Sequence, residues 1–439
     1  MKKKYRIILY TSIFLLCVVA SIILVVKKSN SVYEEESKPK VVKHKSMLSM
    51  NLEQTAGSGD YKTVTQSSWP TEGYKFNAEL SKCENGSTLS WDDTKKAVIM
   101  QGNVSDKCYV YFDIWIPSIA DYCTSGTDLA TCVKNFGDQG PSVSNIYIHN
   151  SSLTNGAGDN SYRYAGANPN KFVCFGSDAS PCPIDNLYRI IGVFGENYHG
   201  ANGKQLVKLI KYDYMTTDEL GTDGDYSQTY KEWGMDSTYK GTYGDGERIG
   251  VYYWNYKATG SATNTWSTSL LNKTNLNTNF INNIGTTWAN KIATVTWKVG
   301  GNTWANIGTK TSSVAYTNEI TNPVTTNTTD NATTYSAKIG LMYVSDYGFA
   351  ASPDAWTLTM SSYNNTTATN NNWMYMGLYE WTISRDADDS GYAFLVGGVG
   401  GVFDGFVGGS CGVRASFNLE SSVSYVSGSG SMSDPIVIN

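Results

Sequence analysis

The chain has 439 residues, enough for two or three compact domains, and a formal net charge of −5 at pH 7. Aromatic residues make up 13% of the sequence and charged residues 17%, a composition that can build large hydrophobic cores and argues against wholesale disorder. The acidic balance and the lack of a basic stripe argue against nucleic acid as a partner.

An apolar segment near the N-terminus predicts a membrane anchor. The run from Ile7 to Val26 carries no charge and has the length of about twenty residues that a helix needs to cross a bilayer. Lysines and an arginine precede it, so the positive-inside rule places the N-terminus in the cytoplasm and the rest of the chain outside the cell. A cleaved signal peptide is the alternative, but its apolar region is normally shorter and ends at a small-residue site. We expect residues 1–28 to be a cytoplasmic tip and a single-pass signal anchor in the cell membrane.

Three domains or linkers are expected between the anchor and residue 184. Residues 29–60 are polar and contain one aromatic residue, Tyr33, which is typical of a solvated stalk. Residues 61–117 alternate strand-like runs with turns, and Val110, Phe112 and Ile114 alternate with other residues as in a half-buried strand; this range predicts a small β module. Residues 118–184 are loop-rich and are interpreted as a connector.

Seven cysteines follow the anchor and predict disulfides, because an exported chain is oxidised. Sequence does not fix their connectivity, but local spacing suggests Cys83–Cys108, Cys123–Cys132 and Cys174–Cys182. Cys411 is left alone. No pair has the C-x-x-C spacing that is typical of zinc sites, so no metal is predicted.

Residues 185–439 predict one sheet-dominated domain. "NLYRIIGVF" and "QLVKLIKYDY" flank a turn-rich segment, as in a hairpin, and strand-like runs continue through "RIGVYYWNY", "KIATVTWKVGG", "KIGLMYVSDYGFA", "YEWTISR" and "VRASFNL". One amphipathic helix is expected in the range 266–284, where Leu276, Phe280, Ile281 and Ile284 share a face. The predicted fold class is therefore α+β.

Acidic residues in this domain suggest two kinds of chemistry. Asp386, Asp388 and Ser390 match the start of a calcium-binding loop, but Gly397 stands at the twelfth position, where such a loop needs a bidentate Glu. A plain acidic turn is the favoured interpretation. Glu380, Asp386 and Asp404 could supply a carboxylate pair for glycoside hydrolysis, but sequence does not give their separation. We therefore predict no catalytic residue and no cofactor.

The segment from Val396 to Gly412, "VGGVGGVFDGFVGGSCG", is the most unusual stretch of the chain. A twisted hairpin with partly buried Val and Phe is one interpretation. Phe403 and Phe406 flank Asp404 on this permissive backbone, and aromatic side chains on such a loop are also typical of a recognition surface.

The C-terminal pattern resembles the C-type-lectin-like domain of the formylglycine-generating-enzyme type, which occurs in surface proteins of Gram-positive bacteria. The resemblance covers 185–439 and rests on Trp381 to Arg385 ("WTISR"), the glycine-rich stretch, and Gly412 to Phe417 ("GVRASF"), where Ala415 stands at a position that is commonly proline. It implies a ligand-binding scaffold. Enzymes of this family bind copper through a cysteine pair, and here Cys411 has no second cysteine in the domain beyond residue 185.

These observations predict a cell-surface adhesin that is not an enzyme and that binds an extracellular protein or glycan. Trp381 and Arg385 are expected to lie beside the contact surface, and Arg414, in an apolar strand, is expected to hold the scaffold by pairing with a carboxylate or carbonyls. The expected ligand-contacting residues are Trp381, Arg385, Tyr392, Phe403, Asp404, Phe406 and Ser410. Alternatives are a structural or pilus-like subunit and a glycan-active extracellular enzyme.

A narrower hypothesis concerns the origin of the glycine-rich stretch. Residues 396–412 use only Val, Gly, Phe, Asp, Ser and Cys, and each is reached from an Asn codon by changing its adenines. Proteins diversified by retroelements through adenine mutagenesis carry their variable stretch at this place on a C-type-lectin-like scaffold. A hairpin simply biased towards Val and Gly is the favoured interpretation.

Overall fold

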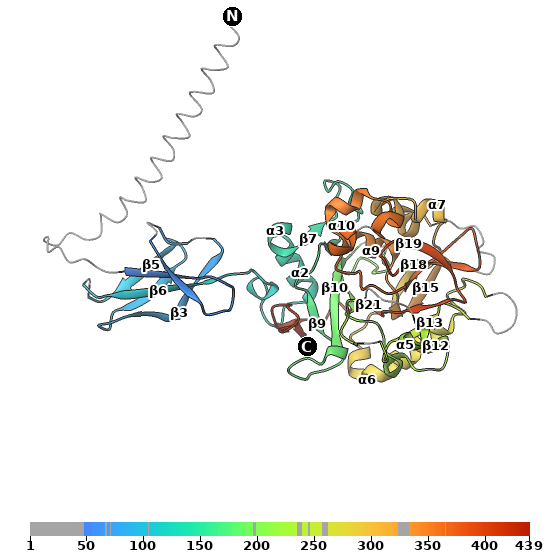
Figure 1. Cartoon of the computed structure of the whole chain (residues 1–439), viewed down its shortest axis with the longest axis horizontal. Helices are drawn as coiled ribbons and strands as arrows, with labels where there is room; N and C mark the ends of the chain where they lie inside the picture. Colours follow the sequence, from blue (N-terminus) through green and yellow to red (C-terminus); the bar gives the residue numbers. More distant parts are fainter. Residues whose placement is uncertain are drawn as a thin grey trace, which may run out of the picture. The chain divides into compact units, whose positions relative to one another are not determined.

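The computed structural model describes residues 48–439 except 66–67, 71, 104, 196–198, 235–238, 245, 257–261, 324–332 and 365. The predicted anchor, Ile7–Val26, lies outside this range. No helix in the described part of the chain is long and apolar enough to cross a membrane. The chain divides into two compact units, Met1–Ile116 (unit 1) and Pro117–Asn439 (unit 2) (Figure 1).

Unit 1 contains a four-stranded sheet of order β2-β1-β6-β3 and a separate β4-β5 hairpin. Strand β1 is parallel to β6, and the other neighbours are antiparallel. The strands are β1 (Leu48–Glu53), β2 (Tyr61–Val64), β3 (Tyr74–Cys83), β4 (Thr88–Asp92), β5 (Ala97–Gln101) and β6 (Cys108–Ile114).

Strand β1 lies within the range that was expected to be a stalk, 29–60. Its Met50 and Leu52 are buried beside Phe112 of β6, and Trp91 of the hairpin meets Phe112 edge-on with ring centroids 5.7 Å apart. In the sequence, Leu48, Met50 and Leu52 alternate with the polar residues Ser49, Asn51 and Glu53, which is the pattern of a half-buried strand. Glu53 is nevertheless buried, because its carboxylate accepts hydrogen bonds from the backbone N–H groups of Gly59 (3.1 Å) and Ile114 (2.9 Å).

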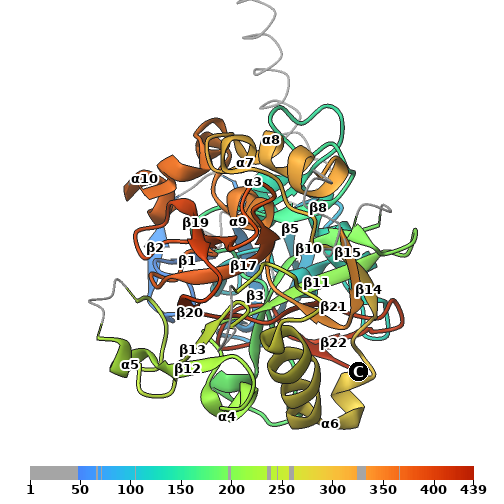
Figure 2. The ribbon, with the colours of Figure 1, turned by 90° about the vertical axis from the view of Figure 1, so that its right-hand side faces the viewer.

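Unit 2 contains two large sheets (Figure 2). One has the order β16-β21-β11-β10-β8-β7, with β9 also paired to β10, and the other has the order β12-β13-β20-β17-β18-β19. Two-stranded pairs β14-β15 and β22-β23 complete the set. The strands are β7 (Ile146–Ile148), β8 (Tyr162–Tyr164), β9 (Phe172–Cys174), β10 (Leu187–Phe194), β11 (Leu206–Lys211), β12 (Tyr226–Thr229), β13 (Gly250–Tyr253), β14 (Val295–Lys298), β15 (Thr334–Ala337), β16 (Ile339–Gly340), β17 (Glu380–Arg385), β18 (Tyr392–Val396), β19 (Val402–Phe406), β20 (Ser410–Gly412), β21 (Ser416–Asn418), β22 (Tyr425–Ser427) and β23 (Val437–Ile438).

Short helices surround these sheets. The α-helices are α2 (Leu129–Gly137), α3 (Pro141–Ser144), α4 (Thr217–Leu220), α5 (Tyr230–Trp233), α6 (Ile281–Ala289), α7 (Trp304–Ile307), α8 (Ser312–Tyr316), α9 (Val344–Ala350) and α10 (Thr366–Asn370). Two π-helical segments are η4 (Leu271–Phe280) and η5 (Thr317–Thr321). The 3-10 helices are η1 (Ile119–Asp121), η2 (Ile184–Asn186), η6 (Pro353–Thr357) and η7 (Met360–Asn364). The fold is thus sheet-rich α+β, as expected.

Residues 118–184, expected to form a connector, are built into unit 2. Strands β8 and β9 pair with β10, and helix α2 buries Cys132, Val133 and Phe136 in the main core. The chain here also joins the C-terminal segment, because the N–H of Gly126 donates to the carbonyl of Tyr425 at 2.8 Å. Loop-rich composition concealed this integration, since strands as short as β8 and β9 leave little periodicity to detect.

The helix expected in the range 266–284 is present. It begins as η4 and continues into α6, and Leu276 and Phe280 are buried in the main core. The run "KIGLMYVSDYGFA" differs from the expectation of a strand, because only β16 is extended and helix α9 begins at Val344. All seven residues of α9 are buried, so the sequence shows no polar face by which a helix could be recognised.

Candidate ligand-binding surface

The glycine-rich stretch forms an edge hairpin. Strands β18 and β19 are antiparallel, with Tyr392 opposite Phe406 and Leu395 opposite Phe403, and β19 is the last strand of its sheet. The backbone on the outer side of β19 therefore has no neighbour within its sheet. This hairpin carries most of the residues expected to contact a ligand.

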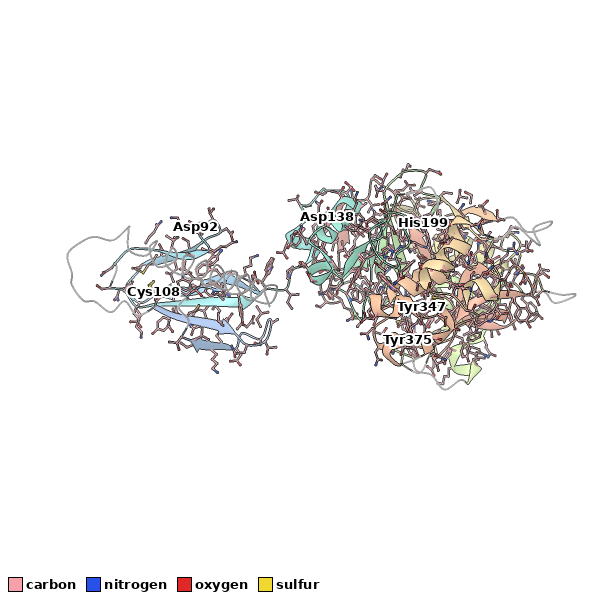
Figure 3. The ribbon with its side chains drawn as sticks, turned by 90° about the horizontal axis from the view of Figure 1, so that it is seen from above. Asp92, Cys108, Asp138, His199, Tyr347 and Tyr375 are labelled. Atoms are coloured by element: carbon pink, nitrogen blue, oxygen red, sulfur yellow. A yellow bond between two sulfur atoms is a disulfide. The ribbon has the colours of Figure 1, made fainter. Side chains whose placement is uncertain are left out.

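The turn of the hairpin, residues 397–401, is held by two buried tyrosines. The hydroxyls of Tyr347 and Tyr375, labelled in Figure 3, donate to the carbonyls of Gly400 and Gly398, each at 2.7 Å. Gly400 has φ of +97°, and an added Cβ there would lie 2.5 Å from Thr369, so this position requires glycine. The turn is thus fixed to the core, and it presents Val399, which is 61% exposed.

Phe406 is the most exposed aromatic residue of the hairpin, with 50% of its surface accessible. Its ring meets the half-buried Tyr392 edge-on, with centroids 6.2 Å apart. A Cβ added at Gly408 would lie 2.6 Å from the Phe406 ring, so the ring lies across the glycine backbone. The glycines therefore support the Phe406 ring, because their backbone lets it lie close against them.

A second aromatic group includes two residues that sequence reasoning missed. The half-buried ring of Phe403 meets the ring of Tyr379 edge-on, with ring centroids 5.8 Å apart. The ring of Tyr379 in turn meets that of Trp233 of α5 edge-on, with centroids 6.0 Å apart. Trp233 is distant in sequence, so no local pattern could join it to the hairpin. The name "aromatic edge" is used below for the aromatic residues on the two faces of this edge of the sheet: Trp233, Tyr379 and Phe403 on one face, and Tyr392 and Phe406 on the other.

Polar groups accompany the aromatic edge. Asp404 lies between Phe403 and Phe406 on β19, opposite Phe394, and is half-buried. Ser410 begins β20 and pairs with Tyr253; it is also half-buried. Both side chains retain access to solvent.

Trp381 and Arg385 do not lie on the surface, which corrects the expectation that they sit beside the ligand. Strand β17 is an interior strand between β20 and β18, and the two side chains are 1% and 0% exposed. The indole N–H of Trp381 donates to the carbonyl of Tyr252 at 2.9 Å. A Cβ at Gly405 would lie 3.4 Å from the Trp381 ring, so Trp381 supports β19 from within.

Arg414 lies where the sequence indicates, in the scaffold. Its Nε and Nη2 donate to the two carboxylate oxygens of Glu380 at 2.8 and 2.9 Å, and Nη2 also donates to the carbonyl of Met374 at 2.6 Å. Both members of the ion pair are buried. Glu380 is therefore used by the scaffold and does not face a sugar-sized ligand, which removes it from the carboxylate pairs considered for hydrolysis.

The acidic turn after β17 is organised by an amide, not by a cation. Asn264 is buried, and its side-chain Nδ2 donates to the carbonyls of Asp386 (2.6 Å), Asp389 (2.9 Å) and Tyr392 (2.7 Å). The carboxylate of Asp386 accepts from the N–H of Asp388 at 2.8 Å, as in an ordinary Asx turn. The carbonyl of Tyr392, at the seventh position, is the backbone ligand that such a calcium loop would use, and it accepts from Asn264 instead.

Asp386 is nevertheless electrostatically unusual. Burial raises the pKa of its carboxyl to about 6, and the negative charges of Asp404 and Asp388 act in the same direction. Asp386 has 3% of its surface exposed, so its proton exchange depends on the turn around it.

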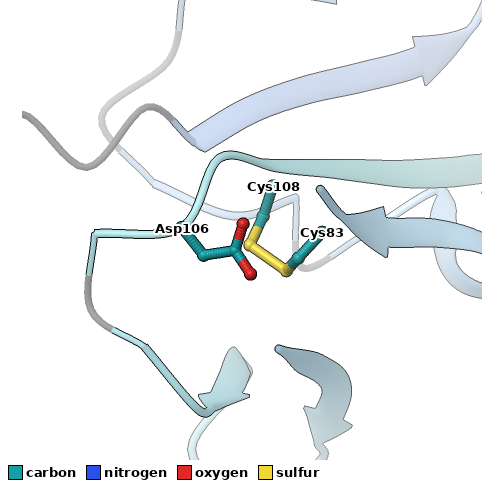
Figure 4. A group of neighbouring side chains, drawn as sticks. All are labelled: Cys83, Asp106 and Cys108. Atoms are coloured by element: carbon teal, nitrogen blue, oxygen red, sulfur yellow. A yellow bond between two sulfur atoms is a disulfide. The ribbon is translucent and has the colours of Figure 1, made fainter. Parts of the chain in front are cut away.

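Among the described residues, one group of His, Cys, Asp or Glu brings three ligand atoms within 4.8 Å of one another: Cys83, Asp106 and Cys108 (Figure 4). Its two sulfurs form a disulfide, so they cannot act as thiolate ligands. Asp106 accepts hydrogen bonds from the backbone N–H groups of Asn85 (2.8 Å) and Ser87 (3.1 Å). This group therefore stabilises the structure of unit 1 through a disulfide and backbone hydrogen bonds.

The disulfides are the three pairs that local spacing suggests, Cys83–Cys108, Cys123–Cys132 and Cys174–Cys182. Cys411 is free and buried, and burial raises the pKa of its thiol well above the usual range. A buried neutral thiol without a second cysteine is a poor copper ligand.

Comparison of the chain with models of protein families, with curated proteins and with solved structures gives no match.

Proposed function

We propose that the chain is a cell-surface adhesin, anchored by Ile7–Val26, that binds an extracellular protein or glycan through the aromatic edge of unit 2. The observation that carries this proposal is the half-exposed ring of Phe406 on the outermost strand of a sheet whose inner strands β17 and β20 are mostly buried. An exposed aromatic ring that lies beside further accessible rings and polar groups is typical of a recognition surface, because it offers a large contact area with few rotatable bonds.

Rigidity supports the proposal. The turn at 397–401 is tied to Tyr347 and Tyr375, and Trp381 supports β19 from behind. A ligand that binds a fixed surface loses less free energy to ordering the protein than one that binds a flexible loop. Aromatic side chains add contact area at low cost in side-chain entropy, and Asp404 and Ser410 supply hydrogen-bonding groups beside them.

The proposed scaffold is a C-type-lectin-like domain of the formylglycine-generating-enzyme type. Two features of burial support this assignment. The first is that both motif segments of the resemblance, Trp381 to Arg385 and Gly412 to Phe417, are buried. The second is that the stretch between them carries the accessible side chains. In such an arrangement the motifs maintain the fold while the intervening hairpin is free to change.

We include diversification by a retroelement in the proposal only for those positions of residues 396–412 whose side chains are accessible to solvent. Val396, Val402, Val407 and Cys411 are buried in the cores, so variation there would disturb packing. The positions that tolerate change are Val399, Phe403, Asp404, Phe406 and Ser410. A near-identical template repeat beside the gene, together with a neighbouring reverse-transcriptase gene, would support diversification; a genome without them would remove it.

The proposed function is tested by binding of the full chain in detergent or vesicles to arrays of glycans and of extracellular proteins. The Phe406→Ala variant is compared with Val437→Ala, which removes an apolar side chain that is 42% exposed on β23. We expect Phe406→Ala to weaken binding about tenfold or more, as at a central contact, while Val437→Ala binds normally. Equal binding by both variants would place the contact surface elsewhere.

A further inference from the structure

A group of charged side chains is fully buried between β8, β11 and α9. The guanidinium of Arg163 contacts Asp159 at 2.7 Å and Asp346 at 3.6 Å, and Lys208 Nζ contacts the Oδ2 atom of Asp346. None of these four side chains is more than 2% exposed. His199, labelled in Figure 3, contacts the same oxygen of Asp159, Oδ2, at 2.9 Å.

The free energy of this group depends on how many charges it keeps. Two carboxylates and two cations balance each other, but each buried ion has lost its hydration, and the penalty amounts to several kcal/mol per ion. Burial lowers the pKa of the Lys208 ammonium, and the nearby carboxylate of Asp346 offsets only part of that effect. A reaction that removed one cation and one anion together would leave Arg163 paired with Asp159 and the group still neutral.

We propose that Lys208 and Asp346 condense to an intramolecular amide bond that covalently joins strand β11 to helix α9. The two residues are 138 positions apart in the sequence, so the bond would close a very long loop. Nothing in the proposed ligand-binding function requires it, and the two proposals are independent.

The reaction balances with the two side chains alone. Burial raises the pKa of the Asp346 carboxyl, but the cations Lys208 and Arg163 outweigh burial and hold that pKa below its ordinary value, so the reacting neutral pair is the minor form. It arises when a proton passes from the ammonium of Lys208 to Oδ2 of Asp346 along their contact, which gives a neutral amine and a neutral carboxylic acid. Nζ then attacks Cγ, a second proton moves from nitrogen to Oδ2, and the Cγ–Oδ2 bond breaks. One water molecule leaves, and the nitrogen keeps one hydrogen in the amide. No oxidant, cofactor or activated group is consumed.

Arg163 is placed to assist this step. Its Nη1 atom and Oδ1 of Asp346 have no hydrogen-bond partner within the described residues, and they face each other across 3.6 Å. When Nζ adds to Cγ, negative charge develops on Oδ1, and a cation at this position stabilises that charge. In the product, Oδ1 is the amide oxygen and still faces the guanidinium.

Aromatic rings exclude water from the reacting atoms. Lys208 Nζ lies 4.4 Å from the ring centroid of Tyr343, 5.2 Å from that of Trp297 and 5.8 Å from that of Phe194. All three rings are buried. The low local concentration of water favours condensation over hydrolysis, because water is a product of the forward reaction.

A second buried lysine on the same strand provides a matched control. Lys211 Nζ contacts Glu219 Oε1 at 3.0 Å, but Glu219 has 17% of its side chain exposed. Its Oε2 atom accepts hydrogen bonds from the N–H and hydroxyl of Thr216 at the start of α4. Asp346 also caps a helix, since its Oδ2 accepts the N–H of Tyr343 at 3.0 Å, so the two carboxylates differ in solvent access. Because Glu219 is partly solvated, its carboxylate is expected to remain in an ion pair.

The test is mass spectrometry of the full chain after reduction of its disulfides. We expect an intact mass lower than the sequence mass by one water molecule, and a protease digest in which one linked peptide contains both Lys208 and Asp346. Lys208→Arg and Asp346→Ala should restore the missing mass, whereas Lys211→Arg should retain the deficit. Recovery of Lys208 and Asp346 in separate, unmodified peptides of the wild-type chain would overturn the proposal, and this readout does not depend on how well any variant folds.

Discussion

The guanidinium of Arg414 and the carboxylate of Glu380 form a two-pronged ion pair, with Nε and Nη2 at 2.8 and 2.9 Å from the two oxygens. The pair joins the residue two positions after β20 to the first residue of β17. Burial raises the pKa of Glu380, and Arg414 opposes that shift. Glu380 therefore depends on Arg414 to remain a buried anion.

Arg414→Ala should destabilise unit 2 by about 3–5 kcal/mol, because it leaves Glu380 buried without its countercharge. Denaturant unfolding followed by tryptophan fluorescence measures this loss. The double variant Arg414→Met with Glu380→Gln should recover much of it, since no charge is then stranded. A double variant no more stable than Arg414→Ala would show that packing, not charge, is what Arg414 contributes.

Alanine substitutions of Trp381, Phe403 and Phe406 should reduce the free energy of unfolding in the order of how deeply these side chains are buried. Trp381→Ala removes a side chain that is 1% exposed and should cost about 3–5 kcal/mol, whereas Phe406→Ala should change the free energy of unfolding by about 0.5 kcal/mol. Phe403→Ala should fall between them, because its ring is half-buried against Tyr379. Thermal unfolding of the three variants gives this order directly. A large loss from Phe406→Ala would identify Phe406 as part of the core and contradict the proposed surface.

Asp386 predicts a pH dependence of stability. Its pKa is raised to about 6, so the folded chain holds this proton more tightly than the unfolded chain does. The contribution of Asp386 is therefore fully present below about pH 4 and is lost as the pH rises through about 6. Asp386→Asn should raise stability by up to about 3 kcal/mol at pH 7 and have little effect at pH 4.

Melting temperatures of wild type and Asp386→Asn across this pH range measure the difference. Asp178→Asn, at an exposed position, serves as the control and should follow wild type at every pH. A variant that is destabilised equally at pH 4 and pH 7 would show that the carboxylate contributes through its hydrogen bond and not through its ionisation.

Asn264 should be essential for the turn after β17. Asn264→Ala removes the side-chain donor from three carbonyls, and a cost of about 1–3 kcal/mol is expected. The carbonyls of Asp389 and Tyr392 keep backbone hydrogen bonds, so the loss falls mainly on that of Asp386. Added calcium should leave the melting temperature of the wild-type chain unchanged, and a chelator should do the same. A rise of several degrees with calcium would restore the calcium-loop interpretation of Asp386, Asp388 and Ser390.

The Cys83–Cys108 disulfide should contribute a large part of the stability of unit 1. It closes a loop with a sequence separation of 25 and joins strands β3 and β6. Replacing both cysteines by Ala should destabilise unit 1 by about 3 kcal/mol on the chain-entropy model. Hydrogen exchange of the amides of β3 and β6 reports the effect. Protection that is unchanged in the double variant would show that the core around Phe112 is sufficient alone.

Local patterns in the sequence predicted much of the fold. The β10–β11 hairpin, the helix through Leu276 and Phe280, and all three disulfide pairs appear as spacing and periodicity indicate. Strand β1 was missed although Leu48, Met50 and Leu52 alternate with polar residues, because residues 29–60 as a whole have the polar composition of a stalk. Helix α9 was missed because it is buried on every side.

The candidate surface was harder to predict than the fold. Phe406 was correctly expected to project from the glycine-rich stretch, but Trp381 was placed on the surface although β17 is an interior strand. Whether a strand lies at the edge or in the middle of a sheet depends on pairing between distant segments, which the local pattern does not contain. Trp233 joins Tyr379 for the same reason, through a contact that only the folded chain creates.

The hydrogen bonds between the two ends of unit 2 affect when it can fold. Leu129 donates to the carbonyl of Val423, and Cys174 donates to that of Ile436, at 2.9 Å each, so the first strands and helix of the unit are completed by the last residues of the chain. Unit 2 therefore cannot complete its fold until residues 423–436 have left the ribosome. While they are being made, the N-terminal half of unit 2 lacks these partners, and export machinery or chaperones can still thread it in an extended form.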